Sequence, residues 1–154
     1  MAPALRPAGW ILTSNMADAN GPHAQLIMQT FLPDGRMELE AALSLLDEDV
    51  DWDMSRSPFP DARLYRGVDG VREWFRGLAQ AFGEVVYEIE RVHEEGIRLA
   101  VQFRVRGRGP SSGIPVDYRF VPLLTFRAGK IVRMERHDEW GAAIAAMGDR
   151  SEGT

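Results

Sequence analysis

The stretch FRAGKIVRMERHDEW, residues 126–140, shows how two neighbouring segments of the chain fold. Its RAG tripeptide is typical of a tight turn between strands, because glycine tolerates backbone conformations that other residues avoid. After the turn, Val132 and Met134 alternate with charged residues, which is the pattern of a strand with one apolar face. The stretch therefore predicts two antiparallel strands joined by a turn, followed by a charged segment at residues 136–139.

The same alternation continues upstream of this stretch. It predicts strands at residues 85–92, 97–106 and 116–127, and the strand after the turn covers residues 130–137. One face of the second of these strands carries only apolar residues, namely Ile97, Leu99, Val101, Phe103 and Val105. Such alternation predicts a sheet that packs one face and leaves the other face in water.

The N-terminal half has helical periodicity. Apolar spacing predicts a pair of helices at residues 23–31 and 37–46, and a longer helix at residues 68–82. Between them, residues 49–54 alternate and predict a strand, and a short helix is predicted at residues 141–147. This order of elements predicts an α+β domain in which a bent sheet wraps the helices. Two helices come first, followed by a strand, a third helix and four antiparallel strands.

Composition limits the class of protein. The 154 residues are 45% apolar, enough for one buried core, and the formal charge of −5 argues against nucleic acid or anionic membranes as partners. Cysteine is absent, and no segment has the length or pattern of a membrane span or signal peptide, so we expect a cytoplasmic protein. We expect a mobile arm at residues 1–22, one domain at 23–148 and a tail at 149–154.

Four stretches together resemble one known family. They are DEDVDWDM (47–54), YRGVDGVREWFRGL (65–78), FRAGKIVRMERHDEW (126–140) and AAIAAMG (142–148). In this order they resemble the SnoaL-like branch of the nuclear transport factor 2-like (NTF2-like) superfamily. The resemblance implies a cone-shaped barrel, in which N-terminal helices pack on a strongly curved, mostly antiparallel sheet around a pocket. It also implies a homodimer. Members include steroid isomerases, polyketide cyclases, epoxide hydrolases and dehydratases, so the fold does not define the function.

The acids of the resembling steroid isomerases are missing here. The resemblance places the carboxylate base at Met54, the second acid near Pro122 and the enolate-stabilising tyrosine near Met28 and Phe31. Methionine cannot accept a proton, and none of the other three side chains can act as the missing acid or hydroxyl. These departures argue against that isomerisation. The pattern of the epoxide hydrolases also fails, because its last-strand aspartate aligns near Arg136.

The charged segment contains the candidate catalytic residues Arg136, Asp138 and His137. If Val132 and Met134 face the interior, alternation turns Arg136 and Asp138 inward and His137 outward. Arg136 would then hold an oxygen and Asp138 would accept a proton, or the two would merely pair with each other. A bulge would instead turn His137 inward, where its ordinary pKa of about 6.5 suits acid–base chemistry.

The neighbouring Glu139 is a further candidate acid, since the resembling polyketide cyclases place one near the end of the last strand. Asp51 and Asp53 lie on the strand face that the resemblance turns away from the pocket, so we interpret them as solvated charges. For the Arg-rich segment 104–109, anion binding is one interpretation and a solvated or dimer-facing strand is the other.

The leading hypothesis is a protein that binds a small apolar organic molecule. The predicted lining is Trp52, Met54, Trp74, Phe103, Tyr118, Leu124 and Met134. A catalytic member would perform acid–base cyclisation, isomerisation, dehydration or hydrolysis without a cofactor. The histidines are too scattered to predict a metal site. A noncatalytic homodimeric binding or interaction module is the alternative.

Overall fold

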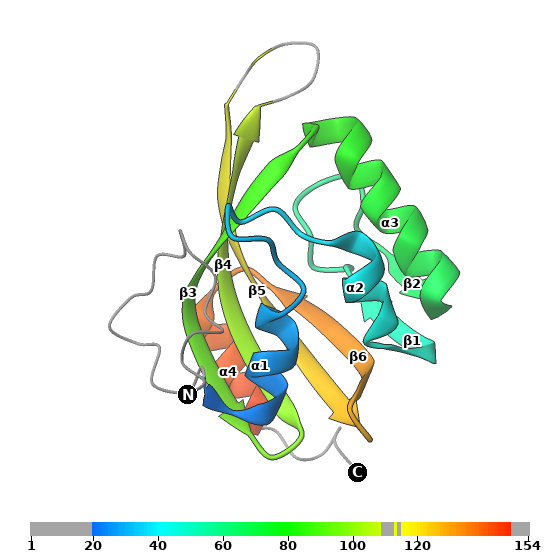
Figure 1. Cartoon of the computed structure of the whole chain (residues 1–154), viewed down its shortest axis with the longest axis vertical. Coiled ribbons are helices and arrows are strands. Elements are labelled where there is room, and N and C mark those ends of the chain that lie inside the picture. The colour runs from blue at the N-terminus through cyan, green and yellow to red at the C-terminus, as the bar shows by residue number, and fades with distance from the viewer. Residues whose placement is uncertain (1–19, 109–112, 114, 149–154) are drawn as a thin grey trace.

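Six strands form one sheet in the computed structural model, which describes residues 20–108, 113 and 115–148 (Figure 1). The elements are α1 (Pro22–Met28), α2 (Leu39–Ser44), β1 (Leu46–Asp53), β2 (Leu64–Arg66), α3 (Gly67–Phe82), β3 (Val85–Glu95), β4 (Arg98–Arg108), β5 (Pro115–Arg127), β6 (Lys130–His137) and α4 (Trp140–Gly148). The strand order is β2-β1-β6-β5-β4-β3, and only β1 and β6 run parallel. The predicted α+β class with a mostly antiparallel sheet is confirmed.

Two predicted segments lie largely outside the described residues. Residues 1–19 of the predicted arm and all of the predicted tail, 149–154, belong to this part of the chain. Within the described part, α1 already begins at Pro22, one residue before the helix that the sequence predicted.

Helices cover both faces of the sheet. The inner face, which we define as the face toward α1, α2 and α3, carries the main apolar core. On the opposite, outer face, Ala143 and Met147 of α4 form a second apolar cluster with Ala100, Val121 and Leu123. The prediction that the second face stays in water is therefore wrong where α4 covers it. The reason is that the side chains at the centre of this face of β4 and β5, Ala100, Val121 and Leu123, are apolar and can pack against a helix.

Strand β2 was not predicted, because three residues are too short to show a period. It pairs with β1 and places Tyr65 opposite Trp52. Strand β1 also begins earlier than predicted, at Leu46, which pairs with Ile131 of β6. The helix expected at residues 37–46 is correspondingly shorter and ends at Ser44.

Strand β6 contains an irregularity that changes its phase. Thr125 of β5 faces Arg133, but the next residue, Phe126, faces Ile131, so Val132 is skipped in the pairing. Ile131 and Met134 both belong to the inner core, whereas Val132 is only half-buried. The expectation that Val132 and Met134 share the inner face is thus wrong for Val132. Beyond the bulge, regular alternation resumes.

Helix α1 is fixed to the sheet through its first turn. Its N-cap residue, Gly21, has no side chain to bond the free amides of the helix. Instead, the carboxylate of Glu94 on β3, which is 9% exposed, accepts hydrogen bonds from the backbone amides of His23 and Ala24, both at 3.1 Å. The His23 ring stacks on Phe126 at 4.2 Å between ring centroids. These contacts hold α1 over the inner face.

Candidate functional site

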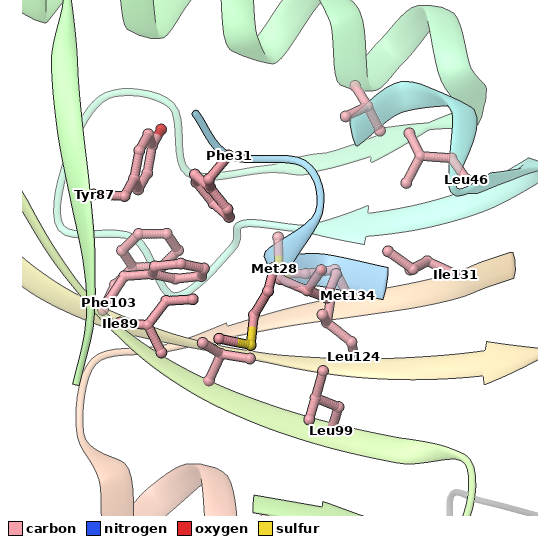
Figure 2. Packing of buried hydrophobic residues seen from close by; sticks show 14 of the residues in the cluster. Met28, Phe31, Leu46, Tyr87, Ile89, Leu99, Phe103, Leu124, Ile131 and Met134 are labelled. Atoms are coloured by element: carbon pink, nitrogen blue, oxygen red, sulfur yellow. The ribbon is translucent and has the colours of Figure 1, made fainter. Parts of the chain in front are cut away.

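A cavity of about 80 Å³ lies between the inner face of the sheet and the three N-terminal helices. Its wall comes from all three helices and from β1, β3, β4, β5 and β6. Aromatic rings form one end, where Phe31, Tyr87 and Phe103 lie with centroids 5.3–5.6 Å apart (Figure 2). Phe120 stacks on Phe103 at 5.6 Å. The site is therefore a largely apolar pocket, a type that usually binds organic molecules.

Four of the predicted lining residues contact this cavity. They are Trp52, Trp74, Phe103 and Leu124. The other three, Met54, Tyr118 and Met134, are not part of the wall. Met54 and Met134 are fully buried in the core, and Tyr118 packs beside the wall residue Phe120, 6.2 Å away between ring centroids.

Two residues near positions that the resemblance assigns to polar groups line the cavity. Pro122, near which the resemblance places the second acid, and Phe31, one of the two residues near the tyrosine position, belong to the wall. Met28, the other residue near the tyrosine position, does not. Because neither Pro122 nor Phe31 can hold or donate a proton, the interior lacks the acid–base groups that the resembling isomerases use.

Few polar atoms lie on the wall. The Thr30 hydroxyl donates to the backbone oxygen of Ile27 at 2.7 Å, and the Trp74 indole N–H donates to Asp61 at 2.7 Å. Burial raises the pKa of Tyr87 well above its ordinary value of 10, so this hydroxyl stays neutral. The indole nitrogen of Trp52 is buried without a hydrogen-bond partner among the described residues. The wall thus presents no charge to a ligand.

Asp61 is a structurally important residue that the sequence analysis did not single out. It lies in the loop between β1 and β2, where its carboxylate also accepts a hydrogen bond from the Ser57 hydroxyl at 2.6 Å. Its bond to Trp74 fixes this loop against α3. A lone aspartate in a loop with serines and prolines has no pattern in the sequence that would have revealed this partner.

Arg136 lies on the inner face, two residues beyond Met134. Its side chain is only 3% exposed, and its Nε and Nη2 atoms each lie 2.9 Å from Oδ1 of Asp138. Asp138 is 40% exposed, so the pair links the interior to solvent. The interpretation that Arg136 and Asp138 pair with each other agrees with this contact. Arg136 also lies on the same face of the strand as Met134, as the alternation predicted.

Aromatic rings surround the Arg136 guanidinium. Its central carbon lies 5.0 Å from the ring centre of Phe120, 5.7 Å from that of Phe59 and 5.8 Å from that of Tyr118. Burial raises the pKa of Tyr118 to about 12, although the charge of Arg136 opposes this shift. Because Phe120 also belongs to the cavity wall, this arginine lies directly behind one wall residue.

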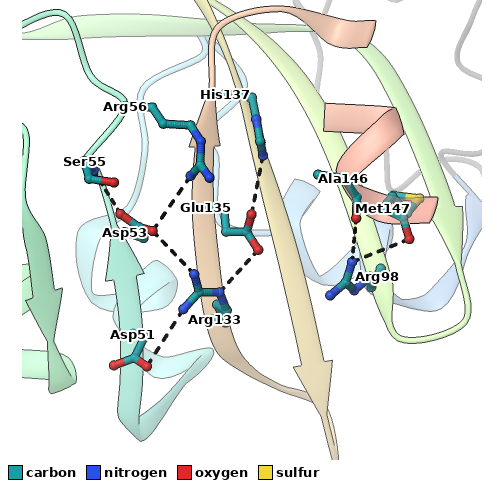
Figure 3. A network of polar contacts seen from close by, with 10 residues as sticks. All are labelled: Asp51, Asp53, Ser55, Arg56, Arg98, Arg133, Glu135, His137, Ala146 and Met147. Carbon is teal, nitrogen blue, oxygen red and sulfur yellow. Dashed lines mark hydrogen bonds and ion pairs between the residues drawn. The ribbon is translucent and has the colours of Figure 1, made fainter. Parts of the chain in front are cut away.

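His137 lies on the outer face, away from the cavity. It is 6% exposed and faces Val121, whose side chain packs on α4, so the strand does not end early or shift here. Its Nε2 lies 3.5 Å from Oε1 of Glu135, which is longer than a good hydrogen bond (Figure 3). Glu139 is exposed at the start of α4. Neither residue contacts the cavity.

Asp51 and Asp53 also lie on the outer face, beside Arg133 (Figure 3). Asp53 is not simply solvated, since it is only 16% exposed and lies 3.4 Å from Arg133. Burial alone would raise the pKa of Asp53, but hydrogen bonds from Ser55 and the nearby arginines lower it overall. Arg133 thus bridges Asp53 and Glu135 across neighbouring strands.

The outer-face network makes a prediction about acid stability. Contact with His137 lowers the pKa of Glu135 from 4.5 to about 2; burial opposes this and Arg133 adds to it. A lowered folded-state pKa stabilises the protein above the unfolded pKa, and this stabilisation disappears as the pH falls toward 2. We therefore expect the free energy of unfolding of wild type to be about 1–2 kcal/mol higher than that of Glu135→Gln at pH 6. At pH 2.5 the difference between the two free energies should be much smaller.

Urea denaturation at the two pH values measures this difference. Glu95→Gln is the matched control, because Glu95 also lies beside a histidine but is 62% exposed. It should change stability little at either pH. A Glu135→Gln deficit that is equal at pH 6 and pH 2.5 would contradict the prediction.

Two arginines of the Arg-rich segment pair with acids on neighbouring strands. Arg104 bonds Asp117 at 2.8 Å, and Arg106 bonds Glu88 at 2.9 Å. Arg108, which is exposed, donates instead to the backbone oxygen of Gly113 at 2.8 Å. Two of the three described arginines of the segment therefore have a carboxylate partner. In the described residues, no three His, Asp or Glu side chains group as a metal site requires. No helix there is long and apolar enough to cross a membrane.

The fold and the cavity define a class of protein: a curled, mostly antiparallel sheet that encloses a pocket under helices. The sequence matches the SnoaL-like domain over residues 34–134, and the chain belongs to the SnoaL-like family. No curated protein matches it.

Several solved structures share the fold. TerC, co-crystallized with polyporic acid, is 21% identical with a TM-score of 0.65, covering 84% of this chain and all (100%) of that one. An NTF2-like protein of unknown function from Burkholderia pseudomallei is 24% identical with a TM-score of 0.58, covering 73% of this chain and 86% of that one. A hypothetical protein with a ketosteroid isomerase-like fold from Catenulispora acidiphila, in complex with trimethylamine, is 14% identical with a TM-score of 0.56, covering 86% of this chain and 88% of that one. These likenesses show the fold alone.

Proposed function

We propose that this protein binds a small, uncharged, mainly apolar organic molecule in the cavity of the inner face. The observation that carries the proposal is the composition of the wall: aromatic and aliphatic side chains with no Asp, Glu, Lys, Arg or His. A charged ligand would lose its hydration there without gaining a counter-charge, so an uncharged ligand is favoured. Two similar structures contain small molecules, polyporic acid in TerC and trimethylamine in the Catenulispora acidiphila protein, which supports a binding role for the fold.

Filling the cavity tests this proposal. Ala42 of α2 lies on the wall, and its neighbour Ala41 does not. We expect Ala42→Phe to weaken binding of any cavity ligand at least about tenfold, because the new ring occupies the space of the ligand. Ala41→Phe adds the same ring to the same helix and should leave the affinity within about twofold.

Ligands for this test come from a panel of uncharged aromatic and aliphatic compounds, selected by the thermal shift of the wild-type protein. Affinities of wild type and both variants are then measured by calorimetry. Equal binding by wild type and Ala42→Phe would place the ligand elsewhere, and a panel without any binder would contradict the proposal.

A catalytic role at Arg136 is a second candidate. The observation that favours it is a buried guanidinium behind Phe120, paired with a carboxylate that reaches solvent. In this candidate Arg136 stabilises negative charge that develops on a substrate oxygen, and Asp138 accepts a proton. The reaction would be a cofactor-independent cyclisation, isomerisation, dehydration or hydrolysis. His137 has no part in this candidate, because it lies on the outer face. Exchange of substrate hydrogens with solvent in Arg136→Met tests it.

A further inference from the structure

Trp52, a residue of the cavity wall, has an indole N–H that is an unused hydrogen-bond donor. Trp52 belongs to the wall, and its Nε1 atom is buried with no partner among residues 20–108, 113 and 115–148. Buried polar groups in folded proteins nearly always have a partner, so each exception calls for an explanation. A donor that the protein leaves unpaired beside a cavity is explained when a ligand supplies the acceptor.

The neighbouring tryptophan shows the contrast. Trp74 lies on the same wall, 5.7 Å from Trp52 between ring centroids, but its N–H already donates to Asp61 at 2.7 Å. Phe75 packs beside both tryptophans, 6.0 Å from Trp52 and 4.6 Å from Trp74, and offers only a ring. The Asp61 carboxylate thus accepts from Ser57 and Trp74, and the Trp52 donor has no partner among the described residues.

We propose that the ligand of the cavity is an apolar molecule with one uncharged hydrogen-bond acceptor, such as an aryl ketone or ether, and that the acceptor bonds Nε1 of Trp52. This inference rests on the proposed function and adds the chemical class of the ligand. An uncharged acceptor fits because the wall has no cation to neutralise a carboxylate. A hydrocarbon fills the same space but leaves the donor unpaired.

A pair of probes isolates the acceptor. Acetophenone and α-methylstyrene have nearly the same shape and differ in a C=O group in place of C=CH₂. We expect wild type to bind acetophenone about 3- to 10-fold more tightly after correction for the different transfer of the two probes from water, the range of one net hydrogen bond. In Trp52→Phe this corrected preference should fall to about onefold.

Two variants serve as controls for the affinity ratio. Trp74→Phe removes a ring of the same type whose N–H is already paired, so the preference for acetophenone should persist. Tyr87→Phe removes the hydroxyl of another ring of the wall, and the preference should persist there too. If Tyr87→Phe abolishes the preference instead, the acceptor bonds Tyr87 and the assignment to Trp52 is overturned.

A measurement on wild type does not depend on the folding of any variant. The indole N–H resonance of Trp52 should shift on addition of acetophenone far more than on addition of α-methylstyrene, because only the ketone accepts the hydrogen bond. Equal binding of both probes with equal shifts would overturn this inference while leaving the proposed function intact. Binding of neither probe, nor of any uncharged compound, would overturn both.

Discussion

Met54→Asp is expected to lower the free energy of unfolding by at least about 3 kcal/mol at pH 7. The resemblance assigns a carboxylate base to this position, yet Met54 is fully buried in the apolar core and does not line the cavity. A carboxylate there would lose its hydration without gaining a cation. Its pKa would rise in the folded state, so the destabilisation should grow as the pH increases above the unfolded value of about 3.9.

Met54→Leu is the matched control and should cost less than about 1.5 kcal/mol, because it conserves volume and polarity. Both variants are compared with wild type by urea denaturation at pH 5 and pH 8. Wild-type stability of Met54→Asp at pH 8 would mean that this side chain reaches solvent or a cation. The position would then be open to the base chemistry that we consider lost.

Five of the six strands were predictable because alternation extends over several residues in each, whereas β2 has only three residues. In β4, Leu99, Val101 and Phe103 all face the inner core, as the period of two requires. Phe103 and Leu124, which this pattern turned toward the interior, both belong to the cavity wall. Alternation reports which side of a strand is apolar, but it cannot separate a wall residue from a core residue on the same side. For that reason Met54 and Met134 were predicted to line the cavity and are core residues instead.

The polar residues were harder to place, because their partners are distant in the sequence. Ile131 and Val132 are both apolar, so nothing in the sequence showed which of them the bulge of β6 excludes from the inner face. Burial of His137 depends on the contact of α4 with the outer face of the sheet, which a strand pattern cannot predict. The hydrogen bond between Asp61 and Trp74 also joins residues that no local pattern in the sequence connects.

The family resemblance and the structure lead to one view of the interior. The resemblance places an acid near Pro122 and a hydroxyl near Met28 and Phe31, and of these residues Pro122 and Phe31 line the cavity. Apolar residues at these points strengthen binding of apolar molecules, since burial of apolar area is favourable. The wall also contains no carboxylate or histidine that could act as a base. In the second candidate function, the chemistry would instead use the charged pair that adjoins the wall, Arg136 and Asp138.

Arg136→Met is expected to slow such chemistry by about 10²- to 10³-fold, the usual effect of removing one donor that stabilises a developing oxyanion. A suitable probe is 4-phenyl-2-butanone, whose ring can occupy the cavity while its ketone extends past Phe120. Asp138 would take a proton from the carbon beside the carbonyl, and the electron pair of the broken C–H bond would move to the oxygen as an enolate held by Arg136. Return of a deuteron from D₂O completes the exchange, which is followed by NMR.

Methionine suits this test because it fills the space of the arginine stem and leaves Asp138, which is 40% exposed, in contact with water. Asp138→Asn should slow the exchange by at least about 10²-fold, because the amide cannot take the proton. Glu139→Gln removes the adjacent exposed carboxylate and should leave the rate unchanged. Exchange in wild type no faster than in buffer, together with unimpaired binding of the probe, would identify a noncatalytic binding protein whose Arg136–Asp138 pair is purely structural.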